Sequence, residues 1–180
     1  MTYGTEVKGP PYCTIVADPP WPEYGGGKIK RGADKHYPLM SIADIKGLAP
    51  IVQSWRGEEG CHLYLWVTQK YLPAGLDIVR AWGFEYQCVL TWVKNVGFTP
   101  FSWMYSTEHV LFARAGGLGL TKLGKRLDFS AKVQGHSVKP DVFYDLVREV
   151  SPAPRVDMFS RRKIVGFTPW GAEASNAKRR

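Results

Sequence analysis

The fold is decided by YCTIVADPPW at residues 12–21, where a mostly apolar run leads directly into Asp18, Pro19, Pro20 and Trp21. A short, nearly continuous apolar run is typical of a buried strand in a parallel sheet. Proline ends such a strand because it has no backbone N–H to donate to the ladder. Ligands of α/β sheets bind beyond the carboxyl ends of the strands, so we expect Asp18 at the rim of a binding cleft. The plain alternative is a turn in which Asp18 only caps the strand.

Strand-like and helix-like patterns alternate along the rest of the chain. Strands are predicted at 12–17, 62–68, 85–94, 108–114 and 154–159. Helices are predicted at 41–55 with an interruption at Pro50, at 72–82 ending at Gly83, and from Pro140 to 150. This alternation predicts an α/β fold whose helices cover both faces of a sheet. The glycine-rich segments 22–36 and 115–136 are predicted to be a mobile loop and a flexible, basic surface segment.

Composition narrows the class of protein. The 180 residues are 44% hydrophobic and 22% charged, which predicts one folded domain over 1–180 and excludes a largely disordered chain. No apolar run approaches the roughly 20 residues that cross a bilayer, and the first residues lack the apolar core of a signal peptide. We therefore expect a cytoplasmic protein without a membrane partner. Cys13, Cys61 and Cys88 are widely spaced and form no CxxC pair, so we expect no metal site and no disulfide.

The net charge of +8 is unevenly distributed. There are 10 basic and 10 acidic residues before Arg114, and 14 basic and 6 acidic residues from Arg114 onward. A one-sided basic excess favours a polyanion such as nucleic acid as the partner, although solvated surface charge explains it equally simply. The candidate phosphate contacts are Lys28, Lys30, Arg31, Lys122, Lys125 and Arg126. The segment GGGKIKR at 25–31 lacks the GxxxxGK[ST] pattern, so it predicts a lid rather than a triphosphate-binding loop.

The residues after the first strand have a chemical reading of their own. The Asp18 carboxylate and a Pro19 carbonyl left unpaired by the prolines can accept both hydrogens of an exocyclic amine. Trp21 offers a flat face on which a base can stack, an interaction worth roughly 1–3 kcal/mol per base. Hydrogen bonds from both amine hydrogens would localise the nitrogen lone pair and make the amine a better nucleophile. The motif therefore suits chemistry on a nucleobase amine, and a proline turn capped by Asp18 is the alternative.

Motifs along nearly the whole chain resemble the DPPW family of adenine-N6 methyltransferases. This family includes the catalytic subunit of the eukaryotic messenger-RNA adenosine methyltransferase and small bacterial and phage DNA-adenine enzymes. The matching stretches, in order, are DPPW at 18–21, RGADKHYPLMS at 31–41, LYLWVTQKYLPAGLDIVRAWGF at 63–84, WVKNVG at 92–97, STEHVLFARAG at 106–116, HSVKPDVFYDLV at 136–147, PRVDMFSR at 154–161 and WGAE at 170–173. The ordered set is far more specific than DPPW alone.

The resemblance implies a Rossmann-like methyltransferase fold, a mostly parallel twisted sheet with helices on both faces and a terminal antiparallel hairpin. It implies S-adenosylmethionine as the cofactor, with the catalytic motif first, a cofactor-binding half at 136–173 and a flexible basic tail at 174–180. Asp18, Pro19, Pro20 and Trp21 would be catalytic. The implied cofactor-binding residues are Asp18, Lys139, Ser160, Arg161, Lys163, Trp170 and Glu173. The implied substrate-binding residues, besides the basic candidates above, are Trp21, Tyr37, Met40 and His136.

The function predicted from these residues is methyl transfer to the N6 amine of adenine in DNA, since the small size suits a stand-alone bacterial or phage enzyme. An RNA adenosine methyltransferase and a non-catalytic nucleic-acid-binding subunit are the alternatives. Related cytosine-N4 enzymes usually carry Ser at the first motif position, so Asp18 favours adenine. A second copy or another subunit is a possible partner. The loop at Trp103–Tyr105 is interpreted either as a base-contacting loop or as a buried cover of the hairpin.

Overall fold

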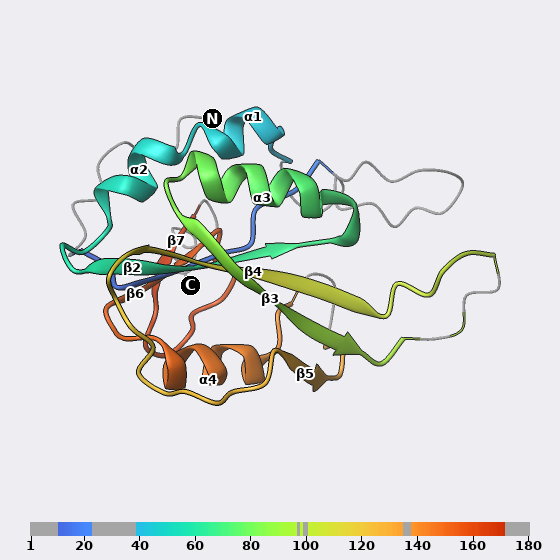
Figure 1. Cartoon of the computed structure of the whole chain (residues 1–180). Coiled ribbons are helices and arrows are strands. Elements are labelled where there is room, and N and C mark those ends of the chain that lie inside the picture. Colours follow the sequence, from blue (N-terminus) through green and yellow to red (C-terminus); the bar gives the residue numbers. More distant parts are fainter. Residues whose placement is uncertain (1–10, 23–38, 97, 99–100, 135–137, 172–180) are drawn as a thin grey trace, which may run out of the picture.

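The computed structural model describes residues 11–22, 39–96, 98, 101–134 and 138–171. Its centre is a seven-stranded sheet with helices packed on both faces (Figure 1). The strands are β1 (Thr14–Ala17), β2 (Gly60–Val67), β3 (Glu85–Lys94), β4 (Thr107–Gly116), β5 (Asp128–Ala131), β6 (Arg155–Met158) and β7 (Thr168–Trp170). The helices are α1 (Ile42–Lys46), α2 (Ala49–Ser54), α3 (Leu72–Ala81) and α4 (Asp141–Val150), with a 3₁₀ turn η2 (Gln69–Tyr71) before α3.

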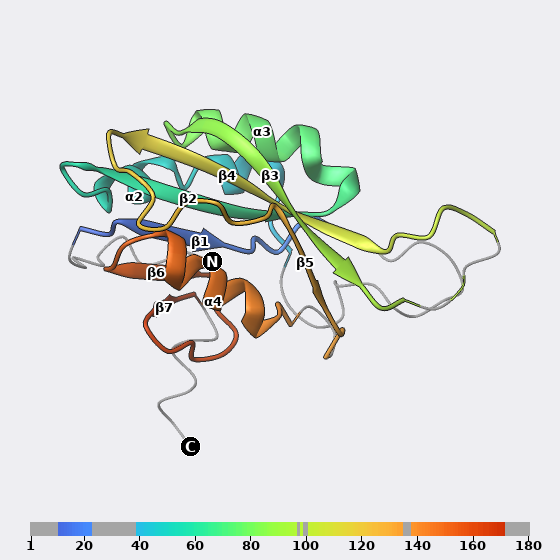
Figure 2. The same ribbon diagram turned by 60° about the horizontal axis from the view of Figure 1, so that its bottom comes forward.

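The sheet has the strand order β5-β3-β4-β2-β1-β6-β7. Every pair among these strands is parallel except the two that β4 makes, with β2 and with β3. The carboxyl ends of β1, β2, β3 and β6 therefore share one edge, and the first residues of β4 lie at that edge too. This arrangement confirms the expected Rossmann-like fold, with the antiparallel β3–β4 hairpin toward one end of the sheet and β5 outside it (Figure 2).

Each face of the sheet has its own apolar core. On the face covered by α1 to α3, the buried cluster includes Ile15, Leu63, Leu65, Ile78 and Leu111. On the α4 face, Val16, Trp66, Val110, Phe143 and Val147 are buried together. Neighbouring residues of a strand point to opposite faces, which explains why β1 and β2 read as continuous apolar runs rather than alternating ones.

Helix ends follow local chemistry that the sequence indicates. The side chain of Ser41 accepts a hydrogen bond from the Asp44 backbone N–H at 3.1 Å, which starts α1 with a capping box. Pro50 stands in the first turn of α2, so the predicted helix at 41–55 is two short helices. Gly83 has a φ of 78°, a left-handed conformation that ends α3 at little steric cost.

The structure contains two strands, β5 and β7, that the sequence does not predict. The segment 115–136 was expected to be flexible throughout, but Asp128–Ala131 forms β5 by pairing in parallel with β3. Four residues with one aromatic side chain give no recognisable period, so only tertiary pairing identifies this strand. Strand β7 contains Pro169, which an edge strand tolerates because its N–H would face away from the ladder.

Gly75 of α3 lets that helix approach the sheet closely. A Cβ atom there would lie 2.6 Å from Val67 Cγ1 and 2.9 Å from Leu111 Cδ1. We predict that Gly75→Val lowers the free energy of unfolding by about 1–3 kcal/mol through overpacking. Denaturant unfolding checks this, with Gly119→Val as the control because nothing lies within 4 Å of its Cβ position. Equal stabilities of the two variants would contradict this packing.

Candidate active site

Asp18 follows β1 and its side chain meets a buried lysine. Its Oδ1 lies 3.2 Å from Nζ of Lys139, and the two side chains are 16% and 11% exposed. Lys139 Nζ also lies 3.0 Å from Oε2 of Glu108 and sits 4.8 Å from the ring centroid of Trp66. The other oxygen of Glu108 accepts a hydrogen bond from Lys94 at 3.2 Å. The result is a row of alternating charges, Lys94–Glu108–Lys139–Asp18, which we call the charge row.

The pKa values of the residues in the charge row are shifted in different directions. Burial raises the pKa of Asp18, and the positive charges of Lys139 and Arg161 offset only part of that rise. Burial alone would lower the pKa of Lys139, but the Asp18 and Glu108 carboxylates outweigh it and the pKa is raised. Burial likewise opposes ionisation of Glu108, yet Lys139 and Lys94 hold its pKa below the ordinary value. Lys139 is therefore a fixed cation, and Asp18 is the carboxylate that protonates more easily.

A small cleft of about 100 Å³ opens in front of Asp18. It is lined by Asp18, Val138, Lys139, Tyr144, Asp157, Met158, Phe159, Ser160, Arg161 and Arg162. These residues come from the end of β1, the start of α4 and the end of β6. Strands β1 and β6 pair with Val16 opposite Asp157 and Ala17 opposite Met158, so Asp18 and Asp157 lie on the same face of the sheet.

Asp157 is a second buried carboxyl group in the cleft. It is 4% exposed and accepts a hydrogen bond from the Tyr144 hydroxyl at 3.4 Å. Burial raises the pKa of Asp157 to about 7, helped by the nearby charge of Asp18 and opposed by hydrogen bonding from Ser160 and Tyr144. Two carboxyl groups whose ionisation burial disfavours therefore line this cleft together with the cationic side chains of Lys139, Arg161 and Arg162.

The chain turns sharply where β6 ends. Phe159 has a φ of 62°, an uncommon left-handed conformation for a residue with a side chain. The Ser160 hydroxyl donates to the Arg162 carbonyl oxygen at 2.7 Å, which closes the turn and keeps these residues along the cleft. Gly171 packs against this turn, since a Cβ there would lie 3.0 Å from Phe159 Cα. Strained backbone of this kind is concentrated at functional sites.

The DPPW motif itself is more buried than expected. The Pro19 carbonyl was predicted to be unpaired, but it accepts a hydrogen bond from the Trp21 backbone N–H at 2.8 Å. Its second lone pair is the one left for a ligand. The Pro20 carbonyl accepts from the Met40 N–H at 2.9 Å, which ties the motif to the segment before α1.

Trp21 and Met40 are buried in the structure, although both are predicted to contact the substrate. Trp21 is only 6% exposed, stacks on Tyr71 with ring centroids 5.2 Å apart, and donates its indole N–H to the Trp66 carbonyl oxygen at 3.1 Å. An open platform for a base is therefore not what its ring presents in this structure. Met40 is 7% exposed and packs in the core beneath the helices, so it supports the motif rather than the substrate.

The cofactor candidates divide into two groups. Asp18, Lys139, Ser160 and Arg161 line the cleft. Lys163 is exposed and not part of the cleft lining, while Trp170 is buried at 8% exposure against Trp55 and Phe159. The predicted contacts at Lys28, Lys30, Arg31, Tyr37, His136 and Glu173 lie outside the described residues.

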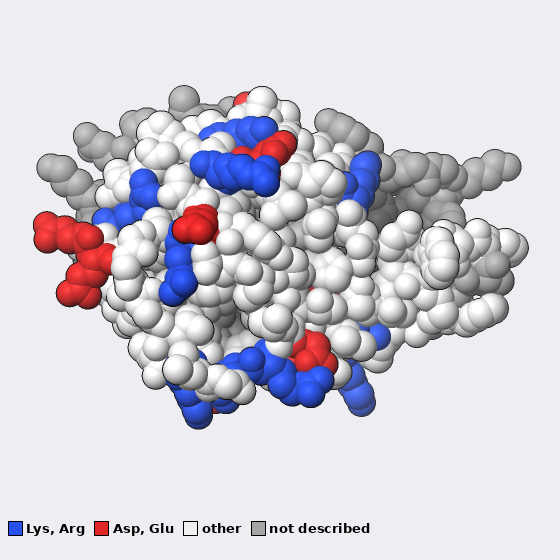
Figure 3. Space-filling model, viewed as in Figure 1, with Lys and Arg blue, Asp and Glu red and all other residues white. Residues whose placement is uncertain are grey.

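The basic segment before β5 is occupied by pairing within the chain. Lys122 and Lys125 both pair with Glu149 near the end of α4, and Arg126 pairs with Asp128 at 2.8 Å. Glu149 precedes the start of β6, which places the two lysines at the edge of the sheet opposite Asp18. On the face drawn in Figure 3, the Lys and Arg side chains lie in separate groups, several beside acidic ones, rather than in one basic strip. The described side chains on this face form no continuous basic track for a phosphate backbone.

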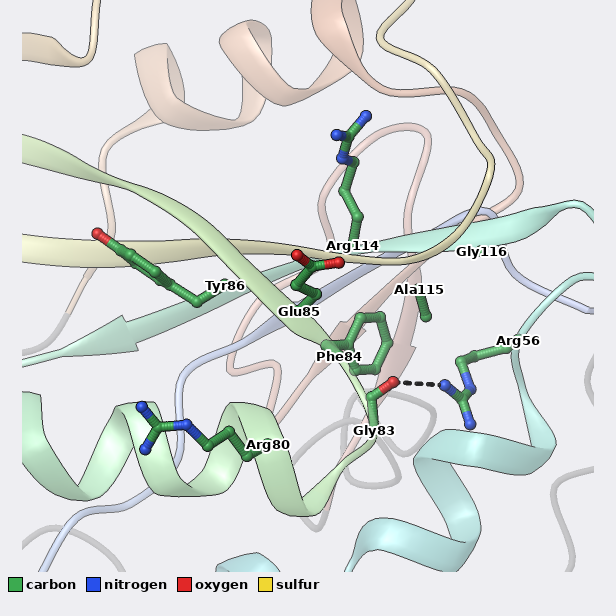
Figure 4. Close-up of a pocket in the computed structure, with 9 residues that line it drawn as sticks. All are labelled: Arg56, Arg80, Gly83, Phe84, Glu85, Tyr86, Arg114, Ala115 and Gly116. Carbon is green, nitrogen blue, oxygen red and sulfur yellow. Dashed lines mark hydrogen bonds between the residues drawn. The ribbon is translucent and has the colours of Figure 1, made fainter.

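A larger hollow of about 610 Å³ lies at that opposite edge, between the end of α3, the start of β3 and the end of β4. Its arginines are Arg56, Arg80 and Arg114, whose guanidinium groups point in different directions (Figure 4). Arg56 donates to the Gly83 carbonyl oxygen at 2.8 Å, and Arg114 to the Gln87 side chain at 3.1 Å. Because ligands of α/β sheets bind at the carboxyl ends of the strands, the smaller cleft at Asp18 is the candidate active site, and the larger hollow is not.

Sequence reasoning missed Glu108 and Asp157. Each is a carboxylate within or beside an apolar strand run, in STEHVLF and PRVDMF, and a carboxylate in such a run is seldom buried without a partner or a role. That signal was present, but the partner of each residue comes from a distant part of the chain. Glu108 pairs with Lys139 and Asp157 lies beside Asp18, contacts that only the folded sheet creates.

The residues of the cleft fit a cationic cofactor that also carries a carboxylate. Asp18 and Asp157 are two carboxyl groups of the cleft lining that can face a sulfonium cation, and Asp18 also pairs with Lys139 at 3.2 Å. Arg161 and Arg162 line the same cleft, and a guanidinium group suits the carboxylate of an amino-acid moiety. These are the two charged features of S-adenosylmethionine. In this structure Arg162 pairs with Asp141 and donates to the Lys139 carbonyl oxygen at 3.0 Å.

A Rossmann-like sheet with an acidic motif at its carboxyl edge and this cleft defines an S-adenosylmethionine-dependent methyltransferase domain. The chain belongs to the MT-A70 family, whose model matches residues 12–173. MT-A70 methyltransferases use S-adenosylmethionine. The described residues contain no helix long and apolar enough to cross a membrane.

Relatives of this chain differ greatly in length. The chain is 26% identical over 190 residues to the type II methyltransferase M.MunI of Mycoplasma sp, which covers 93% of this chain and 79% of that protein. It is 29% identical to an N(6)-adenosine-methyltransferase MT-A70-like protein of Drosophila melanogaster and 26% identical to the catalytic subunit METTL3 of Homo sapiens. Each of those two matches covers 83% of this chain, which spans only 24% and 26% of the two longer proteins.

The raised pKa of Asp157 predicts a pH-dependent stability. The folded chain binds the proton more tightly than the unfolded chain, whose carboxyl titrates near 3.8, so stability falls as pH rises from about 4 to about 7. Asp157→Asn removes this penalty while its amide oxygen can still accept hydrogen bonds. We expect the variant to gain about 2–3 kcal/mol more over wild type at pH 8 than at pH 5. Denaturant unfolding at both pH values measures this, with exposed Asp145→Asn as control; equal gains would show that Asp157 is not strained.

Proposed function

We propose that this protein transfers a methyl group from S-adenosylmethionine to the N6 amine of adenine in DNA. The observation that carries the proposal is the Asp18 carboxylate, which Lys139 holds at 3.2 Å beside a cleft at the carboxyl edge of the sheet. A carboxylate fixed in this way can hold an amine in one orientation, and such positioning accounts for a large part of a rate enhancement.

Asp18 has two roles in this proposal. Its oxygen accepts a hydrogen bond from the adenine amine, and the second lone pair of the Pro19 carbonyl accepts the other hydrogen. These two bonds localise the nitrogen lone pair that the ring otherwise delocalises. Because burial raises the pKa of Asp18, its carboxylate is also suited to take the proton that the nitrogen must lose after methylation.

The cofactor contributes an electrophilic methyl group when it is bound. Asp18 and Asp157 would favour its positive charge, and Arg161 and Arg162 would favour its carboxylate. Lys139 remains paired with Asp18 and Glu108, so its role here is to orient Asp18 rather than to hold the cofactor directly. Cys13, Cys61 and Cys88 need no part in the reaction, since methyl transfer to an amine requires no covalent enzyme intermediate.

A relative of similar length supports DNA rather than RNA as the substrate. M.MunI, a type II methyltransferase, matches 93% of this chain over 79% of its own length, whereas the two animal adenosine methyltransferases extend far beyond the match. The sequence-wide charge of +8 suits either polyanion. RNA is therefore the alternative that the experiment must separate.

Labelled methyl transfer tests the proposed reaction directly. With labelled S-adenosylmethionine, we expect label in the N6-methyladenine of duplex or single-stranded DNA and much less in RNA of the same sequence. Asp18→Asn should lower transfer by about 100-fold or more, while exposed Asp77→Asn leaves it unchanged. Preferential labelling of RNA would show that RNA, not DNA, is the substrate. Undiminished transfer by a folded Asp18→Asn protein would contradict the proposed role of Asp18.

Glu108 acts as a positioning residue within this proposal. It does not line the cleft, but it pairs with the ammonium group of Lys139 at 3.0 Å, as Asp18 does at 3.2 Å. Its own second oxygen is held by Lys94, so the ammonium group of Lys139 is braced by side chains from β3 and β4. Without the negative charge of Glu108, Asp18 is the carboxylate that still pairs with Lys139. The pKa of Asp18 then falls, because the nearby charge of Glu108 no longer raises it.

We expect Glu108→Gln to lower kcat about 10- to 100-fold with little change in KM for the cofactor. The acid limb of the pH–rate profile should move to lower pH, because the pKa of Asp18 falls. A variant that merely unfolds in part would lose active protein without moving that limb. Kinetics across pH 4 to 9, with Asp77→Asn as control, separate the two outcomes, and an unmoved limb would argue against a positioning role.

A further inference from the structure

The loop between β3 and β4 exposes an unusual number of aromatic side chains. Phe98, Phe101, Trp103 and Tyr105 are 81%, 95%, 86% and 63% exposed. Soluble proteins rarely expose a contiguous group of large apolar side chains unless it contacts a partner. We call Phe98, Phe101, Trp103 and Tyr105 the aromatic tip. The alternative that this segment is a buried cover of the hairpin is therefore wrong.

The aromatic tip projects from the same sheet edge as Asp18. Both views of the fold show the β3–β4 hairpin extending beyond the other strands at this edge (Figures 1 and 2). Glu108, whose carboxylate contacts Lys139 of the charge row, comes five residues after Trp103. At about 3.4 Å per extended residue, Trp103 lies within roughly 17 Å of Glu108. That distance corresponds to about five nucleotides of one strand.

The aromatic tip carries no charge of its own. Residues 95–106 contain no Lys, Arg, Asp or Glu, although charged residues make up 22% of the chain. On the face drawn in Figure 3, the described side chains at the far end of this hairpin are white, that is, uncharged. Such a surface has no cationic side chains to bind phosphates, but exposed aromatic rings can stack on bases or insert between them.

We propose that the aromatic tip contacts nucleic acid by stacking on bases next to the target adenine. The proposal rests on the proposed function, because the enzyme must reach an amine that is buried in a duplex until its base leaves the stack. Trp21 does not supply the stacking surface, since its ring is buried against Tyr71. The aromatic tip is the exposed aromatic group at the catalytic edge in the part of the chain that the structure describes.

The test is a pair of double variants with opposite placement. Phe101→Ala with Trp103→Ala removes most of the aromatic tip, and both residues are too exposed for their loss to affect folding strongly. Leu123→Ala with Val165→Ala removes side chains that are 77% and 82% exposed elsewhere. Trp103→Phe keeps a ring at the tip. Binding is measured by fluorescence anisotropy with a labelled duplex that contains an unpaired adenine, and with its single strand.

We expect the tip variant to bind roughly 5- to 150-fold more weakly, with the control and Trp103→Phe near wild type. The slope of log affinity against log salt should stay unchanged, because no phosphate contact is lost. Unchanged affinity would overturn the inference, as would a reduced salt slope. If wild type binds neither probe, the proposed function fails as well, which distinguishes the two failures.

Sedimentation velocity on the same samples separates nucleic acid from a second copy of the chain as the partner. Our account predicts the same oligomeric state for wild type and the tip variant. A wild-type dimer that the tip variant converts to a monomer would show that the tip joins two copies, and would overturn the inference even if binding also fell.

Discussion

The site depends on one buried cation held between two carboxylates. Lys139 lies 3.2 Å from Asp18 and 3.0 Å from Glu108, with its ammonium over the ring of Trp66. Removing one partner of such a buried pair is costly, because an uncompensated charge is left in a poorly solvated place. The ammonium group thus fixes the direction of Asp18, and Asp18 in turn faces the cleft that suits a sulfonium cofactor. The proposed catalytic role of Asp18 depends on that contact.

The topology explains why this contact can form. Asp18 follows β1, Glu108 is the second residue of β4 and Lys139 precedes α4, so three distant segments meet at one edge. Glu108 reaches the edge only because β4 runs opposite to the other strands. The same hairpin that brings Glu108 to Lys139 carries the aromatic tip outward. The antiparallel strand therefore connects Glu108, the proposed positioning residue, to the proposed base-contacting surface.

Much of the fold was predictable because its signals are local. The apolar runs of β1 and β2, the break at Pro50 and the glycine after α3 are read within a few residues. Strand β5 was not predictable from local sequence, because it forms only by pairing with the distant strand β3. In the site, Asp18 was predicted from its position after a strand, and it lines the cleft. The burial of Trp21 and the pairing of Lys122 with Glu149 depend on neighbours distant in sequence, which no local pattern specifies.

A crystal structure with bound S-adenosylhomocysteine would test the central claim most directly. Our account predicts the ligand in the cleft lined by Asp18, Asp157 and Arg161, with the Lys139 ammonium within about 4 Å of both the Asp18 and Glu108 carboxylates. Density for the ligand in the hollow near Arg56 and Arg114, or an Asp18 side chain turned away from both Lys139 and the ligand, would contradict it.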